Sequence, residues 1–382
     1  MFKAEWAKEN DFDEILEKAD IIFGGEGNTD YFQLYHPKLY SVRNSATEHL
    51  VVREEDGIKG MLGVFPAEMS VCGRSLKVDG FGTMGVLKSA RGKGYMKDLM
   101  NTAVEASAKR ADLAFLGGRR QRYEYFGFTP SGVSAQFSFN SDNGKHSIGG
   151  ADTSDIKFSK IDADDKIVLD FIESLTVSKA AYVKRDRNLL HAILHTCRNT
   201  PYLISKNDSP IGYVVAGGEN RMICEIELKD LSLLPLVLTA YLKNFELRGV
   251  FVSGNFMFER EKLTALEAVC ETCTLTGCES FLIHDFVKVL DAFFALKATY
   301  TKLYDGKTVF EINGRGRIAI EVKNGVHSVT KTTDDANVRI SPIEATRLFF
   351  GITAHLDFDK GIDHGLAANF PLPLFYSRPD FV

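Results

Sequence analysis

The chain has 382 residues, of which 45% are hydrophobic and 25% are charged, and its formal net charge is −5. This composition excludes a collagen-like, low-complexity or disordered chain, and a length of this size predicts two or three domains at roughly 100 to 200 residues each. The mildly acidic balance, without basic blocks, argues against nucleic acid as the main partner and suits positively charged small molecules better.

The first residues, MFKAEWAKENDFDEI, are acidic and lack the apolar core of a secretory signal. The longest nearly apolar run, Leu231 to Leu242, is interrupted by Pro235 and is shorter than the roughly 20 residues that cross a bilayer. Six cysteines are too few for a disulfide scaffold. We therefore expect a cytoplasmic protein with no membrane partner.

Residues 1–145 alternate helix and strand signals and are expected to form the first domain. The clearest predicted helix is Gly92 to Arg110, because Met96, Leu99 and Ala103 lie on one apolar stripe. Leu113 to Leu116 then predicts a buried strand. Other helical or strand-like runs lie at residues 11–23, 30–40, 49–53, 58–71 and 76–86. This order predicts a sheet covered by helices.

A polar, glycine-containing stretch from Asn140 to Asp155 is interpreted as a linker, and residues 146–280 as a second domain with further helix and strand signals. Two groups in or near this domain could imitate metal sites. One is Cys270, Cys273 and Cys278 followed by His284, and the other is the pair His191 and His195. The cysteine spacing is not a standard structural zinc pattern, and the histidine pair lacks neighbouring carboxylates, so we expect no metal.

Residues 281–382 have the pattern of a small α+β domain. The dipeptide Asn324-Gly325, placed between two strand-like runs, predicts a tight hairpin. Further on, Ser341 as N-cap, Pro342 at the first helical position and Glu344 three residues after the cap predict a helix start with a capping box.

The most informative segment joins the predicted strand that ends near Val86 to the helix that follows it. It reads Arg91-Gly92-Lys93-Gly94-Tyr95. Glycines at a helix start let a ligand approach the backbone closely, while free N–H groups and the positive helix end attract phosphate oxygens. The segment lacks the glycine patterns of nucleotide triphosphatases and dinucleotide folds. We interpret it as a diphosphate-binding turn, although a turn that serves helix packing alone has the same composition.

About thirty residues later the chain reads Tyr123-Glu124-Tyr125-Phe126-Gly127-Phe128. Together with Arg91-x-x-Gly94, this segment resembles the acetyl-coenzyme A signature of GNAT acetyltransferases. The resemblance implies that Val86 and Leu87 offer backbone contacts to the pantetheine chain of acetyl-CoA. It also implies that Arg91, Gly92, Lys93, Gly94 and Tyr95 hold the diphosphate.

The whole-chain plan is similar to that of the enhanced-intracellular-survival (Eis) aminoglycoside acetyltransferase family. This resemblance implies an α+β / α/β fold with tandem GNAT domains, in which the second domain is degenerate. Residues 150 to 280 indeed contain no [RQ]-x-x-G-x-[GA] pattern. A sterol-carrier-protein-like domain would complete the chain, and a homo-oligomer, such as a hexamer, is also implied.

By the same resemblance, Tyr123 is the general acid for the departing thiolate, and the terminal carboxylate, here on Val382, lies in the active site. Family members commonly end in phenylalanine, whereas this chain ends Asp380-Phe381-Val382. A carboxylate with a pKa near 3.5 is a poor base for an ammonium group, so its expected work is to hold a cationic amine or to act through water. Asp380 could share this task.

On the acceptor side, acidic and aromatic residues alternate in the region from Phe23 to Tyr40, which suits an amine-bearing molecule because aromatic faces and carboxylates both attract cations. An ordinary amphipathic helix has the same pattern. The candidate acceptor-binding residues are Glu26, Asp30, Phe32 and Tyr35.

The sequence thus predicts an N-acetyltransferase that moves acetyl from acetyl-CoA to a primary amine of a small, cationic acceptor resembling an aminoglycoside or a polyamine. Two alternatives stay open. One is a module that binds coenzyme A and an apolar ligand without catalysis, and the other is a protein-lysine acetyltransferase.

Overall fold

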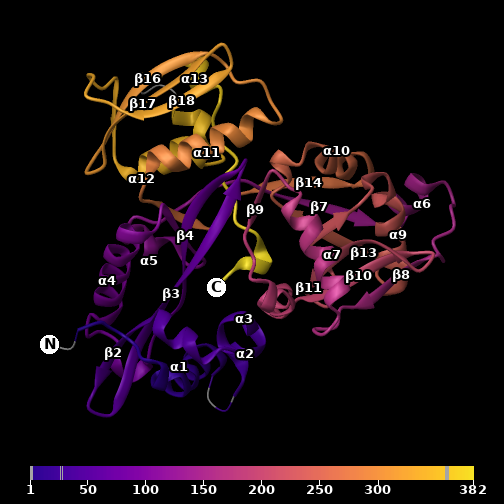
Figure 1. Cartoon of the computed structure of the whole chain (residues 1–382), viewed down its shortest axis with the longest axis horizontal. Helices are drawn as coiled ribbons and strands as arrows, with labels where there is room; N and C mark the ends of the chain where they lie inside the picture. The colour runs from indigo at the N-terminus through magenta and orange to yellow at the C-terminus, as the bar shows by residue number, and fades with distance from the viewer. Residues whose placement is uncertain (1–2, 26, 28, 358–360) are drawn as a thin grey trace. The chain divides into compact units, whose positions relative to one another are not determined.

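The computed structural model describes residues 3–25, 27, 29–357 and 361–382. They form two compact units, whose elements are labelled in Figure 1. The first unit comprises Met1–Gly132, Gly277–Leu374 and Val382, and the second comprises Val133–Thr276 and Phe375–Phe381. Among the described residues, no helix combines the length and the apolarity needed to span a bilayer.

The larger sheet of the first unit has the strand order β1-β2-β3-β4-β5-β15-β6. Strands β4 and β5 are parallel, and the other neighbours along this order are antiparallel. The bounds are β1 (Glu5–Trp6), β2 (His49–Glu54), β3 (Gly57–Val71), β4 (Arg74–Val86), β5 (Leu113–Leu116), β6 (Thr129–Pro130) and β15 (Ser280–Ile283). The predicted buried strand at Leu113–Leu116 is confirmed.

Both faces of this sheet are buried. Successive side chains of a strand point to opposite faces, and the strands of this sheet carry apolar side chains on both faces. On one face, Val51 and Met61 pack with α1 (Phe12–Ala19), α2 (Tyr31–Tyr35) and α3 (Pro37–Tyr40). On the other face, Leu50 and Leu62 pack with α4 (Tyr95–Arg110). The predicted amphipathic helix is therefore confirmed, with its start at Tyr95.

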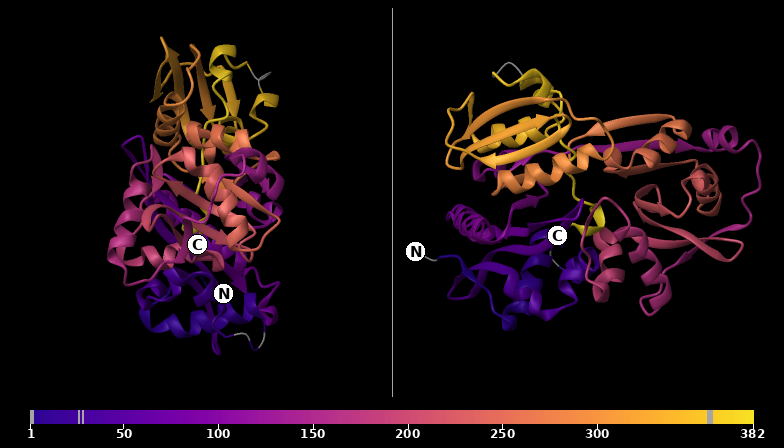
Figure 2. Two further views of the ribbon diagram at one scale, coloured as in Figure 1. Left: turned by 90° about the vertical axis from the view of Figure 1, so that its right-hand side faces the viewer. Right: turned by 45° about the horizontal axis from the view of Figure 1, so that its top comes forward.

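The small sheet of the first unit has the strand order β18-β17-β16-β19. Figure 2 shows it with helix α11 along one face. Its elements are α11 (Phe286–Ala298), β16 (Gly306–Ile312), β17 (Gly316–Lys323), β18 (Val326–Lys331), β19 (Val338–Ile340), α12 (Pro342–Phe350) and α13 (His364–Ala367). The hairpin at Asn324-Gly325 is confirmed by positive φ at both residues, and the capping box of Ser341 and Glu344 is confirmed as well.

The second unit is a sheet of strand order β14-β7-β13-β12-β11-β10-β8 with helices packed on it. The strands of this sheet are β7 (Ser134–Asn140), β8 (Ile156–Lys160), β10 (Thr200–Lys206), β11 (Ser209–Gly217), β12 (Met222–Leu228), β13 (Gly249–Gly254) and β14 (Thr272–Thr276). The short strand β9 (Ala181–Val183) also belongs to this unit but not to this sheet. Its helices are α6 (Ser141–Ile148), α7 (Lys166–Val177), α8 (Leu190–Leu194), α9 (Leu234–Asn244) and α10 (Arg260–Val269). Together the two units confirm the predicted class of mixed sheets flanked by helices.

The expected linker at 140–155 is wrong in its first half, because residues 141–148 form helix α6. The side chain of Asn140 caps this helix by accepting hydrogen bonds from the backbone N–H groups of Asp142 and Asn143, each at 2.9 Å. Gly144 permits close packing on α9, since a Cβ there would lie 2.9 Å from Oγ1 of Thr239. Polar composition thus concealed a short, well-capped helix.

Candidate functional site

Strands β4 and β5 separate at the end of their parallel pairing. The pairing runs from Val78 with Leu113 to Phe81 with Leu116, where β5 ends. Strand β4 continues to Val86, paired only with β3 over the described residues. A parallel neighbour that stops early leaves backbone hydrogen-bonding groups of the longer strand open to a ligand.

The turn between β4 and α4 has open space beside both of its glycines. Gly92 and Gly94 have φ angles of 84° and 86°, which glycine adopts at little cost. A Cβ at either position would meet no atom within 4 Å, so packing does not explain these glycines. Gly94 caps α4, whose first-turn N–H groups and positive dipole end face this space. The predicted diphosphate turn thus has the geometry of an anion site.

A cavity of about 810 Å³ joins the open edge of β4 to this turn. The predicted residues that line it are Val86, Arg91, Gly92, Gly94, Tyr95 and Tyr123. Leu87 and Lys93 do not line it. The N–H of Leu87 donates to the carbonyl of Lys59 at 2.9 Å, and the ammonium group of Lys93 pairs with Glu54 at 2.7 Å.

Several residues of this cavity were missed by the sequence reasoning. Ile22 and Phe23 lie in the helical segment Asp20–Gly24 that follows α1. They lie over Gly85, where a Cβ would be 2.9 Å from Ile22 and 3.2 Å from Phe23. No local motif marks them, because their place depends on packing against β4. The others are Met84, Ala90, Met96, Lys97, Arg122, Tyr125 and Phe126. Tyr125 and Phe126 belong to the recognised Tyr-x-x-Phe-Gly segment and could have been included.

Tyr123 ends helix α5 (Arg120–Tyr123) and lines the cavity with a half-buried ring. The ring passes beside Gly118, where a Cβ would lie 2.8 Å from it. Burial raises the pKa of the Tyr123 phenol, and the nearby charge of Arg122 opposes this only in part. The phenol therefore carries its proton at neutral pH, which a general acid requires.

The segment after Tyr123 is anchored from α12. The guanidinium group of Arg347 forms an ion pair with Glu124 and donates from Nε to the hydroxyl of Thr129 at 3.0 Å. Arg120 also pairs with Glu124, at 3.1 Å. These contacts hold the backbone next to the candidate acid, so the C-terminal part of the first unit helps to position the site.

The C-terminal residue lies on the sheet of the first unit. A Cβ at Gly82 would be 2.7 Å from the carboxyl carbon of Val382, and a Cβ at Gly80 would be 2.6 Å from its side chain. Gly80 and Gly82 are two residues apart in β4 and therefore lie on the same face of the strand. The two glycines therefore form a platform on which the chain end rests, and the sequence reasoning missed them.

Beside this platform lies a buried chain of hydrogen bonds. The Tyr40 hydroxyl is 2.5 Å from Oγ1 of Thr83 and 3.1 Å from Nε2 of His49. Thr83 has a φ of 53° and lies where the pairing of β3 and β4 shifts register. Burial lowers the pKa of His49 to about 4, so its ring is neutral at pH 7. These hydrogen bonds hold Thr83 in place, at the irregular position of β4 directly after Gly82.

Three of the predicted acceptor residues, Asp30, Phe32 and Tyr35, lie in helix α2 or directly before it, but their side chains differ in exposure. Asp30 is exposed at the start of α2, whereas Phe32 is 4% exposed and packs edge-on against Tyr40 at 5.3 Å. Tyr35 stacks on Tyr31 at 5.7 Å. Glu26 lies outside the described residues.

Asp380, the fifth candidate, belongs to the second unit. Its carboxylate accepts from Nε and Nη2 of Arg185 at 2.9 and 3.0 Å, and it is only 4% exposed. The carboxylate that the sequence offered to a cationic acceptor is therefore engaged in a buried ion pair. In the part of the chain that the structure describes, no group of three or more histidine, cysteine or acidic side chains could hold a metal ion.

Comparison with known families identifies the N-terminal region. Residues 4–131 match the family described as an acetyltransferase (GNAT) domain. This region is a GNAT acetyltransferase domain. It contains the open edge of β4, the glycine turn and Tyr123, so the prediction of an enzyme with this domain is confirmed. No curated protein matches the sequence significantly.

Solved structures share the fold over the whole chain. A GCN5-related N-acetyltransferase from Anabaena variabilis is 15% identical with a TM-score of 0.71, and the match covers 100% of both chains. One from Kribbella flavida is 15% identical with a TM-score of 0.69, covering 99% of this chain and 98% of that chain. Eis1 from Mycobacterium abscessus is 13% identical with a TM-score of 0.64, with the same coverage. At such identities the similarity concerns the fold.

Proposed function

We propose that the protein transfers an acetyl group from acetyl-CoA to a primary amine of a small cationic acceptor. The observation that carries this proposal is the cavity of about 810 Å³ that joins the open edge of β4, the glycine turn and the phenol of Tyr123. One end suits a pantetheine chain, the other suits a diphosphate, and a proton donor lies on the wall.

The residues fit direct transfer without an acyl-enzyme. Acetyl-CoA supplies an activated thioester. The neutral amine attacks the carbonyl carbon, the C–N bond forms and the C–S bond breaks, and Tyr123 gives its proton to the departing thiolate. An N–H group at the open edge of β4 can polarise the carbonyl. In this proposal the carboxylate of Val382 attracts the cationic acceptor, and the proton that the amine must lose leaves through water held by this carboxylate.

The identity of the acceptor is tested with a panel of amines. Release of free thiol from acetyl-CoA is measured against aminoglycosides, polyamines and lysine-containing peptides. We expect turnover with a small polyamine-like or aminoglycoside-like amine. Turnover with peptides alone would indicate a protein-lysine acetyltransferase. Stabilisation by coenzyme A without turnover of any amine would indicate a binding module.

Substituting Gly94 by aspartate should abolish stabilisation by acetyl-CoA. A ligand at a hundredfold excess over Kd stabilises a protein by about 2.7 kcal/mol, and a carboxylate beside the diphosphate would remove this through charge repulsion. Aspartate tolerates positive φ better than most residues, and the space at Gly94 is open, so the fold should persist. Thermal unfolding with and without acetyl-CoA measures the effect.

Gly73→Asp is the matched control for this substitution. Gly73 lies in the β3–β4 hairpin with a φ of 77°, and a Cβ there also meets no atom within 4 Å. It does not line the cavity. The control should keep the full ligand-induced shift. An equal shift in both variants would show that the coenzyme binds elsewhere.

Deleting Val382 should raise the KM for the amine and lower kcat by about tenfold, which is less than the roughly 10²- to 10⁴-fold contribution of a positioned acid or base because water can replace part of it. The deletion moves the carboxylate to Phe381 and uncovers Gly80 and Gly82, but it leaves the buried ion pair of Asp380 intact. The shift produced by acetyl-CoA should remain. A short tag fused after Val382 should act similarly, whereas the same tag at the N-terminus should have no effect. Unchanged kinetics in both altered C-termini would remove the terminus from the mechanism.

A further inference from the structure

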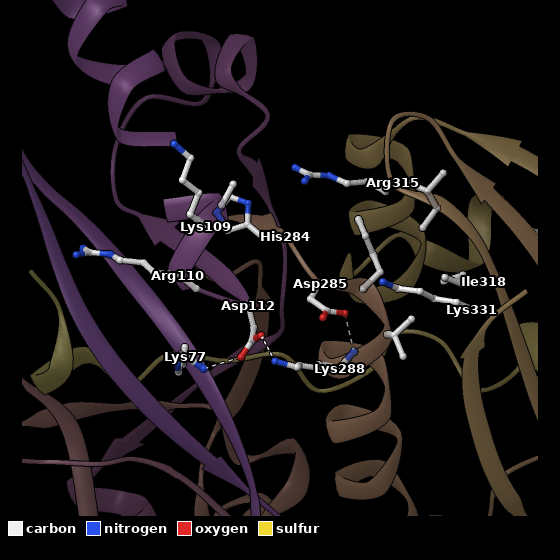
Figure 3. Close-up of a pocket in the computed structure, with 15 residues that line it drawn as sticks. Lys77, Lys109, Arg110, Asp112, His284, Asp285, Lys288, Arg315, Ile318 and Lys331 are labelled. Atoms are coloured by element: carbon white, nitrogen blue, oxygen red, sulfur yellow. Dashed lines mark hydrogen bonds and ion pairs between the residues drawn. The ribbon is translucent and has the colours of Figure 1, made fainter. Parts of the chain in front are cut away.

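The first unit contains a second cavity, of about 380 Å³, which shares no lining residue with the first. Figure 3 shows its lining side chains. Its walls are the C-terminal end of α4, the start of α11 and the ends of strands β16–β18. The GNAT domain thus supplies one side of the cavity, and the small sheet with its helix supplies the other.

The lining is rich in cations, and the nearby carboxylates are already engaged. Asp112 pairs with Lys288 at 2.9 Å and accepts from the backbone N–H of Lys77 at 2.9 Å. Asp285 accepts from the backbone N–H of Lys288 at 3.1 Å. The Nε of Arg110 forms an ion pair with the carboxylate of Asp79 at 3.0 Å.

Four other cations of the lining form no ion pair with the described residues. They are Lys77, Lys109, Arg315 and Lys331. Figure 3 shows Arg315 and Lys331 reaching from the side of the small sheet toward His284 and Asp285. Lys109 is in the last turn of α4, where a cation also stabilises the helix dipole. That explanation does not extend to Arg315 and Lys331, which lie in a strand-connecting turn and at a strand end.

His284 adds a buried ring nitrogen, Nδ1, that has no hydrogen-bond partner among the described residues. Its Nε2 is 3.0 Å from the hydroxyl of Ser107, whereas its Nδ1 is buried without a hydrogen bond. Burial, and to a smaller extent the charge of Arg315, lowers the pKa of His284 to about 4, so the ring is neutral at pH 7. When the Ser107 hydroxyl donates to Nε2, the ring proton is on Nδ1 and can be donated to a ligand.

We propose that this cavity binds a small anion that carries a phosphate group. Arginine presents a planar fork of donors that fits phosphate oxygens, and lysines add point charges around it. The volume lies at the lower end of the range for small-molecule sites, which suits a phosphate, a diphosphate or a small phosphate ester. The site is separate from the proposed diphosphate turn and does not depend on the proposed acetyl transfer.

The test is titration calorimetry on the full-length protein in the presence of saturating coenzyme A, which keeps the diphosphate turn occupied. The probes are inorganic phosphate, inorganic pyrophosphate and glycerol 3-phosphate. We expect saturable binding of one equivalent of at least one probe. Each of Arg315→Ala and Lys331→Ala should weaken it about fivefold or more, and the double variant more than tenfold.

Lys323→Ala is the matched control, because Lys323 is an exposed residue of β17 that does not line the cavity. It should bind the probes within twofold of the wild type. Tight binding of the inorganic probes alone would identify an inorganic anion as the ligand, and preference for glycerol 3-phosphate would identify a phosphate ester. The proposal is overturned if no probe binds saturably, or if the double variant binds as the wild type does.

Discussion

Substituting Tyr123 by phenylalanine should lower kcat by about ten- to a thousandfold while acetyl-CoA continues to stabilise the protein. The change keeps the ring beside Gly118 and removes only the hydroxyl. A positioned general acid contributes roughly 10² to 10⁴ in rate, part of which water can replace. Steady-state kinetics with the best amine, together with the thermal shift by acetyl-CoA, separates the chemical step from binding.

Tyr125→Phe is the control for this substitution, because Tyr125 lines the same cavity but is 69% exposed. It should keep kcat within a few fold of the wild type. Since burial raises the pKa of Tyr123 above its ordinary value near 10, the phenol stays protonated from pH 7 to 9. Loss of the Tyr123 hydroxyl should therefore cost the same factor across this pH range. Unchanged turnover of Tyr123→Phe would assign the acid role to another group or to water.

The cofactor side of the candidate site is predicted from local signals. The glycines of the Arg91-to-Tyr95 turn, the apolar stripe of α4 and the Tyr-x-x-Phe-Gly segment each depend on residues close together in sequence. Six of the eight residues predicted for the acid and the cofactor line the cavity: Val86, Arg91, Gly92, Gly94, Tyr95 and Tyr123. Leu87 and Lys93 do not line the cavity, because the partners of their polar groups, Lys59 and Glu54, lie on other strands.

Long-range contacts explain what the sequence could not provide. Strand β15 pairs with β5 and β6 although more than a hundred residues separate them, so Ser280–Ile283 completes the sheet of the N-terminal domain. The need for glycine at positions 80 and 82 is visible only in the structure, where Val382 lies against both residues. On the acceptor side, the aromatic and acidic pattern of the Phe23-to-Tyr40 region matches an amphipathic helix equally well, and Phe32 is in fact part of the core.

A second large effect is expected in the second unit, where Arg185 binds two buried carboxylates. It donates to Glu225 at 2.9 and 2.7 Å and to Asp380 at 2.9 and 3.0 Å. Glu225 also accepts from the hydroxyls of Tyr213 at 2.6 Å and Ser377 at 3.0 Å. Burial alone would raise the pKa of Glu225, but the charge and hydrogen bonds of Arg185 outweigh it and lower the pKa below its usual range.

Arg185→Met should therefore destabilise the protein by about 3 to 5 kcal/mol, because it leaves Glu225 and Asp380 buried without their cation. Urea unfolding measures this loss. Arg187→Met is the control. Arg187 pairs with the largely exposed Asp170, so its loss should cost under about 1 kcal/mol. A similar loss of unfolding free energy in both variants would show that the buried ion pairs of Arg185 stabilise the protein no more than the exposed ion pair of Arg187 does.

The same substitution should show a defined pH dependence. In the wild type, a depressed carboxyl pKa contributes stability above the unfolded value near 4.3, and this contribution is lost as pH falls through the folded pKa. In Arg185→Met, the effect of burial on the pKa of Glu225 is no longer opposed by Arg185, so Glu225 takes up a proton at higher pH. Protonation removes the buried negative charge, so acid relieves the destabilisation that this charge causes. The difference in unfolding free energy between wild type and variant should therefore narrow as pH falls from 7 toward 4. A difference that stays constant over this range would mean that lost packing of the Arg185 side chain, rather than unpaired charge, causes the destabilisation.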